Sequence, residues 1–174
     1  MDTVLTVVLV VVIIALLVGA AFLPRWVRRS STAAGARAGA RFTAERMTQL
    51  LTELGTTLRI QAPPEVAAAL LHAAVAGHEK AYAVLDDGTV GIRFVEPDDT
   101  VVRLGPDAEG TLLRVETFRD YLGFPQTAPL WRELRERVTA EAAARRIEVS
   151  DGPVSMFERG DLLDDRNARW FRRA

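Results

Sequence analysis

The most constraining feature of this sequence is an uncharged, apolar run from Thr3 to Leu23. A helix rises about 1.5 Å per residue, so this run is long enough to cross the hydrocarbon core of a bilayer, about 30 Å thick. A helix of this length in a soluble protein would need a polar stripe, and every face of this one is apolar. The sequence therefore predicts a transmembrane anchor over residues 1–24.

A cleaved secretory signal is the alternative interpretation of this run, and it fits poorly. Such signals start with basic residues and have an apolar stretch of about 7–15 residues before a small-residue cleavage site. Here Asp2 precedes a longer apolar stretch, and the small residues at its end are followed at once by Phe22, Leu23 and Pro24. We expect the anchor to be retained.

The charges around this run predict its orientation. Five arginines follow it before the first acid, Glu45: Arg25, Arg28, Arg29, Arg37 and Arg41. Basic residues close to a span stay on the cytoplasmic side, and tryptophan favours the headgroup region. We therefore expect an outside N-terminus, a cytoplasmic C-terminal domain, and a membrane interface formed by Arg25, Trp26, Arg28 and Arg29.

A similar pattern recurs at the other end of the chain, in the segment Arg169-Trp170-Phe171-Arg172-Arg173. Aromatic rings among arginines can lie in the headgroups of anionic lipid, which would put Trp170 and Arg172 at the same membrane. The competing interpretation is that Trp170 and Phe171 fill a gap in the core while the arginines are solvated. The sequence leaves both open.

Composition limits the remaining chain to one domain with an acidic surface. Residues 25–41 are basic and rich in Ala, Gly and Ser, which predicts a flexible linker. From Glu45 onward acids outnumber bases by five, which argues against a nucleic-acid partner. The absence of cysteine excludes disulfides, thiolate metal ligands and a thiol nucleophile. Lys80 is the only lysine, a bias typical of GC-rich bacterial coding.

An amphipathic helix and a short extended segment are expected over residues 42–60. Thr43 can cap the helix, Phe42 and Met47 can form a hydrophobic staple, and Gly55 can end it. Its apolar residues fall at helical spacing and form one stripe: Met47, Leu50, Leu51 and Leu54. The stripe either packs on the protein's own domain or pairs with a second copy of the chain.

Residues 61–174 predict an α+β domain with an antiparallel meander of about four strands, packed with flanking helices. A helix from Glu65 to Gly77 should bury Val66, Leu70, Ala73 and Ala74. Asp86-Asp87-Gly88 then predicts a hairpin between residues 80–85 and 89–95, with Tyr82, Val84, Val90, Ile92 and Phe94 on its buried face. Turns at 96–99 and at Gly105-Pro106-Asp107 with Gly110 lead to strands at 101–104 and 112–116.

The C-terminal part predicts more helix than strand. Thr117 can cap a short helical turn up to Leu122, and Thr127-Ala128-Pro129 starts a long helix reaching about Arg146, with Leu130, Leu134, Val138 and Ala142 inward. A short strand at 147–149 and a final helix from Asp161 to Ala174 complete this interpretation.

No constellation of residues predicts catalysis, a metal site or a cofactor. His72 and His78 are six residues apart, so they do not share a helix face as two zinc ligands would. The pairs Asp86-Asp87 and Asp98-Asp99 fall at turns, where aspartate is favoured by local hydrogen bonding. Motifs for phosphate loops, dinucleotide binding, serine hydrolases and zinc proteases are absent from the sequence.

We therefore expect a bacterial single-pass membrane protein with a non-catalytic, cytoplasmic protein-interaction domain. Its partners would be the bilayer and a protein at the inner leaflet, with a second copy as one candidate. Partner contacts are expected at the sheet edges and at Tyr121, Trp131, Arg132 and Arg135. Two alternatives remain: a ligand-sensing pocket lined by Tyr82, Phe94 and Trp131, and an enzyme if Asp86, Asp98 or His78 converge on one cavity.

Overall fold

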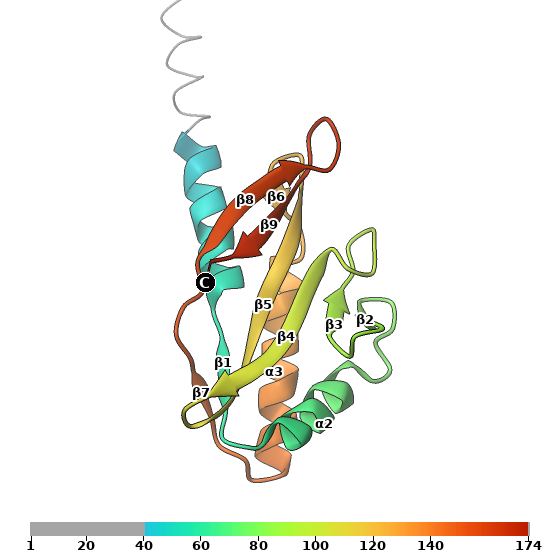
Figure 1. The fold of residues 1–174 in the computed structure, drawn as a ribbon, viewed down its shortest axis with the longest axis vertical. Coiled ribbons are helices and arrows are strands. Elements are labelled where there is room, and N and C mark those ends of the chain that lie inside the picture. Colours follow the sequence, from blue (N-terminus) through green and yellow to red (C-terminus); the bar gives the residue numbers. More distant parts are fainter. Residues whose placement is uncertain (1–40, 174) are drawn as a thin grey trace, which may run out of the picture. The chain divides into compact units, whose positions relative to one another are not determined.

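The computed structural model describes residues 41–173, which form an α+β fold with three helices and a mostly antiparallel sheet (Figure 1). The chain divides into two compact units, Met1–Arg46 and Met47–Ala174, and the sheet belongs to the second. The predicted anchor and most of the predicted linker lie outside the described residues. Within residues 41–173, no helix has the length and hydropathy needed to span a bilayer.

The first described helix covers residues 41–55 and confirms the predicted amphipathic helix and its end at Gly55. Leu50 and Leu54 are buried in the core, whereas Met47 and Leu51 are half-buried. The prediction that Thr43 caps this helix is wrong, because Arg41 and Phe42 are already helical. Phe42 is 72% exposed.

Nine strands make up the sheet of the described chain. They are β1 (Leu58–Ile60), β2 (Tyr82–Val84), β3 (Val90–Ile92), β4 (Thr100–Asp107), β5 (Gly110–Tyr121), β6 (Phe124–Pro125), β7 (Val149–Asp151), β8 (Phe157–Leu162) and β9 (Ala168–Arg172). The main order is β2-β3-β4-β5-β1-β7, and all strand pairs are antiparallel. Strand β9 pairs with the C-terminal half of β5, and β8 pairs with β9.

The predicted four-stranded meander is confirmed as β2 to β5, and it is part of a larger sheet. Gly88 has a φ of 78°, as the predicted hairpin turn requires. The chain reverses between Asp107 and Gly110, within the predicted turn, but the predicted start at Gly105 is wrong because β4 continues to Asp107. Proline is accommodated there because it faces Thr111 close to the end of the ladder.

Tyr82, Val90 and Ile92 are buried, as the alternating pattern of the hairpin predicts. Val84 and Phe94 are 55% and 52% exposed, so the prediction that they are buried is wrong. Both lie at the ends of the hairpin, Val84 next to the turn and Phe94 in the loop after β3. Period-two alternation identifies a common face, but it does not show how far the helices extend across that face.

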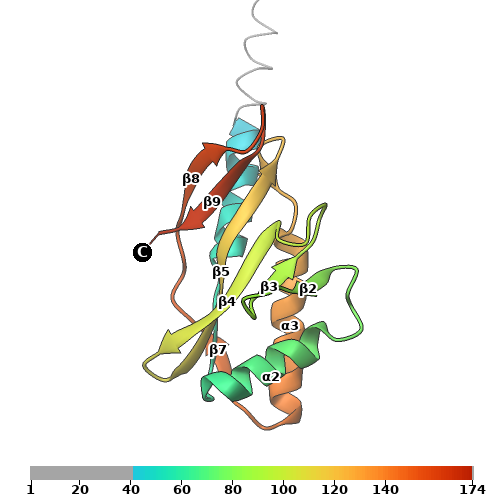
Figure 2. The same ribbon diagram turned by 45° about the vertical axis from the view of Figure 1, so that its right-hand side comes forward.

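Helices α2 (Pro64–Val75) and α3 (Ala128–Ala144) lie on the same face of the sheet (Figures 1 and 2). The structure confirms both helices, and the core between them and the sheet contains Trp131, which is fully buried. Helix α2 buries Ala67 and Leu71 together with the predicted Leu70 and Ala74. Val66 is 37% exposed, because it does not lie on the face of α2 that packs against the sheet.

Residues 157–172 form a β-hairpin, so the predicted final helix from Asp161 is wrong. The helical turn predicted after Thr117 is also wrong, because β5 extends to Tyr121 and pairs with β9. Trp170 stands opposite Phe118, and their rings stack with centroids 5.7 Å apart. The strand conformation of both segments therefore depends on a partner about fifty residues away, which local pattern does not reveal.

The packing of β5 against the β8–β9 hairpin can be tested at Phe118, whose side chain is fully buried and contacts Phe157 and Trp170. We expect Phe118→Ala to lower the free energy of unfolding by about 3–5 kcal/mol, since it removes a large core side chain. Urea denaturation of residues 41–174 measures this. Phe42→Ala, on an exposed turn, is the matched control and should change little; equal effects would contradict the packing.

Candidate functional site

Three loops meet at one end of the sheet and line an open groove of about 900 Å³. They are the β3–β4 loop, the β5–β6 turn and the β8–β9 turn. The groove is lined by Phe94, Tyr121, Leu122, Gln126, Asp164, Asp165, Arg166 and Asn167. Exposed apolar side chains are concentrated in and next to these loops: Phe94, Val95, Leu122, Leu162 and Leu163. Side chains of this kind in loops are a common mark of a binding surface.

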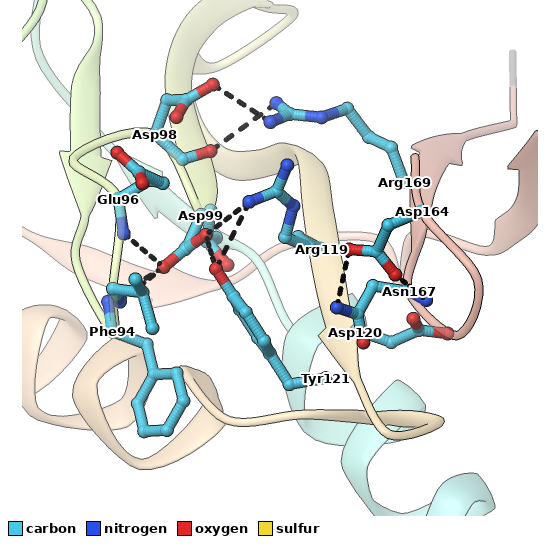
Figure 3. A network of polar contacts seen from close by, with 12 residues as sticks. Phe94, Glu96, Asp98, Asp99, Arg119, Asp120, Tyr121, Asp164, Asn167 and Arg169 are labelled. Atoms are coloured by element: carbon cyan, nitrogen blue, oxygen red, sulfur yellow. Dashed lines mark hydrogen bonds and ion pairs between the residues drawn. The ribbon is translucent and has the colours of Figure 1, made fainter. Parts of the chain in front are cut away.

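The fully buried Asp99 holds the β3–β4 loop in place (Figure 3). One carboxylate oxygen accepts three successive backbone N–H groups, from Phe94 at 3.2 Å, Val95 at 2.6 Å and Glu96 at 2.8 Å. Hydrogen bonds to an ionised acceptor are the stronger kind, and three from one segment fix its backbone. The loop that presents Phe94 is therefore rigidly attached to the sheet.

The other carboxylate oxygen of Asp99 connects the loop to β5. It accepts a hydrogen bond from the Tyr121 hydroxyl at 2.7 Å, and the Arg119 guanidinium lies 3.9 Å away. The Tyr121 ring packs against Phe94 with centroids 5.2 Å apart. Burial raises the pKa of Tyr121, and its hydrogen bond to Asp99 raises it further. Tyr121 thus lines the groove with a neutral hydroxyl.

A second fully buried carboxylate, Asp120, holds the β8–β9 hairpin. It accepts the backbone N–H of Ala168 at 2.6 Å and the indole N–H of Trp170 at 3.0 Å. Arg159 lies 3.5 Å from the same carboxylate and partly neutralises it. Asp120 and its strand neighbour Tyr121 thereby fix two different loops.

The turn between β8 and β9 is closed by Asp164 and joined to the β5–β6 turn by Asn167. Asp164 accepts the backbone N–H groups of Arg166 and Asn167, both at 2.9 Å, and these bonds lower its pKa. Asn167 accepts the backbone N–H of Leu122 at 3.0 Å. All three loops are consequently connected by hydrogen bonds before any partner binds.

Leu122 is the unusual residue of the site. It has a φ of 54° and is 70% exposed. With Gly123 at φ 83°, it forms a two-residue hairpin turn between Tyr121 and Phe124. Such turns favour Asn-Gly, and a leucine in the left-handed region costs about 1–2 kcal/mol. Leu122 therefore combines backbone strain with an exposed apolar side chain, a combination that is common at functional sites.

The groove has the properties of a binding surface. Its apolar walls come from Phe94, Tyr121 and Leu122, and its polar rim offers the carboxylate of Asp165 and the guanidinium of Arg166. Neither of these two charged groups pairs with another described residue. Among residues 41–173, no three potential metal ligands cluster together.

The predicted partner-binding residues have different environments. Tyr121 lies in the groove. Trp131 is fully buried, so the prediction that it contacts a partner is wrong; the hydrophobic face of α3 is rotated to include it. Arg132 is exposed and forms a bidentate pair with Glu53, and the Arg135 guanidinium lies 5.7 Å from the Trp131 ring centroid.

The predicted membrane-interface residues lie in separate parts of the chain. Arg25, Trp26, Arg28 and Arg29 are outside the described residues. Trp170 is half-buried on Phe118, while its neighbour Phe171 is 44% exposed. Arg172 pairs with Glu116 at 3.3 Å. Trp170 therefore contributes to packing inside the domain.

The residues considered for a pocket or an enzyme do not converge. Tyr82 and Trp131 are core residues, and of the three expected pocket residues Phe94 alone lines the groove. His78 contacts Arg137 on α3, and Asp98 pairs with Arg169 at 2.9 Å. Asp86 stays in the hairpin turn.

Sequence reasoning did not identify Leu122, Asp99 or Asn167 as parts of a site. The dipeptide Leu122-Gly123 was a usable signal, because a glycine after a short apolar run marks a turn. Asp99 and Asn167 also bond within their own turns, which explains aspartate and asparagine there locally, but the contacts that join the loops come from Tyr121 and Leu122 and leave no local signal. Comparisons with protein-family models, curated proteins and solved structures find no match to this chain. Its function is accordingly inferred from this geometry.

Asp99→Asn tests the role of the buried carboxylate. We expect the free energy of unfolding to fall by about 3 kcal/mol, because charge-assisted hydrogen bonds are lost. We also expect the pKa of Tyr121 to fall towards its ordinary value of 10, since the neighbouring negative charge is removed. Ultraviolet titration in a Tyr82→Phe background reports Tyr121 alone, because the chain has two tyrosines.

Stability should also depend on pH through Tyr121. The raised pKa of Tyr121 contributes stability that is present below the unfolded pKa of about 10 and is lost as pH rises through the folded pKa. The free energy of unfolding of Asp99→Asn should therefore decline less than that of the wild type as pH rises above about 10. Asp86→Asn, at an exposed turn, is the control; the same response from both variants would contradict the proposed role of Asp99.

Proposed function

We propose that this protein is a single-pass membrane-anchored binding protein whose cytoplasmic domain recognises a segment of a partner protein through the three-loop groove. The observation that carries the proposal is the strained and exposed Leu122, held by Asn167 beside Phe94. The domain acts by binding and not by catalysis. Membrane attachment is supported by the apolar run from Thr3 to Leu23 and the arginines after it.

Binding of a protein segment fits the groove better than binding of a small molecule. Small-molecule sites enclose about 70–90% of their ligand, whereas this groove is open and is flanked by exposed side chains. Rigid loops with exposed apolar anchors are typical of protein interfaces, because little conformational entropy is lost on binding. The buried carboxylates Asp99 and Asp120 supply that rigidity.

Leu122→Asn separates binding from stability. Asparagine favours the left-handed conformation, so we expect the free energy of unfolding to rise by about 1 kcal/mol. Partner binding should fall by at least tenfold, because the apolar anchor is lost. A photo-crosslinking amino acid at Gln126, on the groove rim, should give one adduct in membranes of the native host, and Leu122→Asn should abolish it.

A second crosslinker position, at Thr139 on the exposed side of α3, is the control and should give no such adduct. An adduct that persists in Leu122→Asn would refute the groove as the binding surface. Loss of the adduct together with a loss of stability would show that Leu122 acts in folding alone, and would also reject the proposal.

The proposed topology has an independent test, because the chain lacks cysteine. Ala108→Cys places one thiol in the exposed turn between β4 and β5. We expect an impermeant maleimide to leave it unlabelled in intact cells and to label it after the membrane is opened. Labelling of intact cells would place the domain outside, and recovery of the protein without its apolar run would exclude the anchor.

A further inference from the structure

A second apolar groove, of about 380 Å³, runs beside the first described helix. It is lined by Leu51, Thr52, Val154, Ser155, Met156 and Phe157. Val154 and Met156 are each 67% exposed, which is unusual for large apolar side chains. Met47, one turn before Leu51 on the same side of the helix, is half-buried and extends this apolar surface.

The segment that carries Val154 and Met156 is fixed to the helix end and to β1. The Ser155 N–H donates to the Gly55 carbonyl at 2.8 Å, and the Thr57 hydroxyl donates to the Pro153 carbonyl at 2.8 Å. A Cβ at Gly55 would lie 2.4 Å from the Ser155 oxygen, so only glycine allows this approach. The apolar side chains are thus held at the surface by the backbone.

The surface is also free of net charge. From Met47 to Gly55 the helix has one charged residue, Glu53, and Arg132 neutralises it with two hydrogen bonds of 2.5 Å. Residues 152–157 have no charged side chain. About a quarter of the whole chain is charged, so this surface stands apart from the rest. Two copies of an uncharged apolar surface can pack against each other, since no like charges oppose each other across the contact.

We propose that this surface is a homodimer interface, in which the helices of two copies pack in parallel through Met47 and Leu51 and are flanked by Val154 and Met156. The occupant is a second copy because each chain continues from this helix into the proposed anchor. Two anchors in one membrane tether both copies at the same bilayer, and a parallel pairing of the helices then brings identical faces together. Methionine suits such a contact, because its flexible side chain adapts to its own symmetry mate.

The small size of the groove determines how the dimer forms. A stable interface between free proteins buries more than about 1,000 Å² in total, and a groove of this size does not approach that alone. Confinement in a membrane raises the effective concentration, to about millimolar for short linkers, and makes a weak contact significant. The inference therefore rests on the membrane attachment in the proposed function, and it adds a second surface that the three-loop groove does not use.

Single-cysteine crosslinking of the full chain in native membranes tests this interface without interference from other thiols. We expect oxidation to convert most of Leu51→Cys into a disulfide-linked dimer. Gln49→Cys, on the opposite side of the same helix, is the matched control and should remain at least tenfold less crosslinked. No dimer from Leu51→Cys, or equal crosslinking at both positions, would overturn the proposal.

A second variant tests the other side of the proposed interface. Adding Met156→Asp to Leu51→Cys places two carboxylates across the two-fold axis, and we expect crosslinking to fall at least fivefold. Membrane recovery and the Gln126 adduct should not change, because Met156 is not in the three-loop groove. Unchanged crosslinking would overturn the homodimer. If the crosslinker at Gln126 gave no adduct in the otherwise wild-type chain, the proposed function would be rejected instead. Failure of the homodimer and failure of the proposed function are therefore distinguishable.

Discussion

The fold depends on the hydrogen-bonded ladders of β5, the longest strand in the described chain. Strand β4 pairs with β5 from Gly110 to Phe118, β1 pairs with residues 111–113, and β9 and β6 pair with the C-terminal end of β5. Every other strand reaches the sheet through these partners. Because the backbone groups of a buried strand must all be paired, the path of β5 determines where the meander, the N-terminal segment and the C-terminal hairpin are placed.

The same strand organises the three-loop groove. Arg119, Asp120 and Tyr121 follow one another at the end of β5, and their side chains reach different loops because neighbours in a strand point to opposite faces. Tyr121 meets Asp99 and Phe94, while Asp120 meets the β8–β9 hairpin. Burying two carboxylates is costly, and each is compensated by hydrogen bonds from N–H groups and by a nearby arginine. The result is a rigid rim around Leu122.

The two apolar surfaces differ in the charge around them, and this difference suits them to different partners. The three-loop groove has free charges at its rim, Asp165 and Arg166, which can select a partner of complementary charge. The surface at Leu51 and Met156 is uncharged and continuous with the helix that leads towards the N-terminus. A membrane-tethered protein with both would bring two copies of one recognition groove together, which strengthens binding to a multivalent partner.

Sequence alone determined the elements with strong local signals. Asp86-Asp87-Gly88 specifies the hairpin turn, Thr127-Ala128-Pro129 begins α3, and Gly55 ends the first described helix. Glycine allows backbone conformations that other residues avoid, and proline fixes its own φ. Helical and alternating periodicity gave the α+β class and most of the core. The apolar run and its arginines predict an anchor on the same kind of evidence.

Only the tertiary structure decided the C-terminal hairpin and the candidate site. Phe118 and Trp170 are strand residues because they stack on each other, and neither segment has a periodicity that reveals the other. Trp131 is buried because α3 is rotated to pack it, which the apolar pattern left ambiguous. Asp99, Asn167 and Leu122 come together from three loops. Local sequence determines backbone preference over a few residues, whereas burial and distant contacts depend on where the whole chain places each side chain.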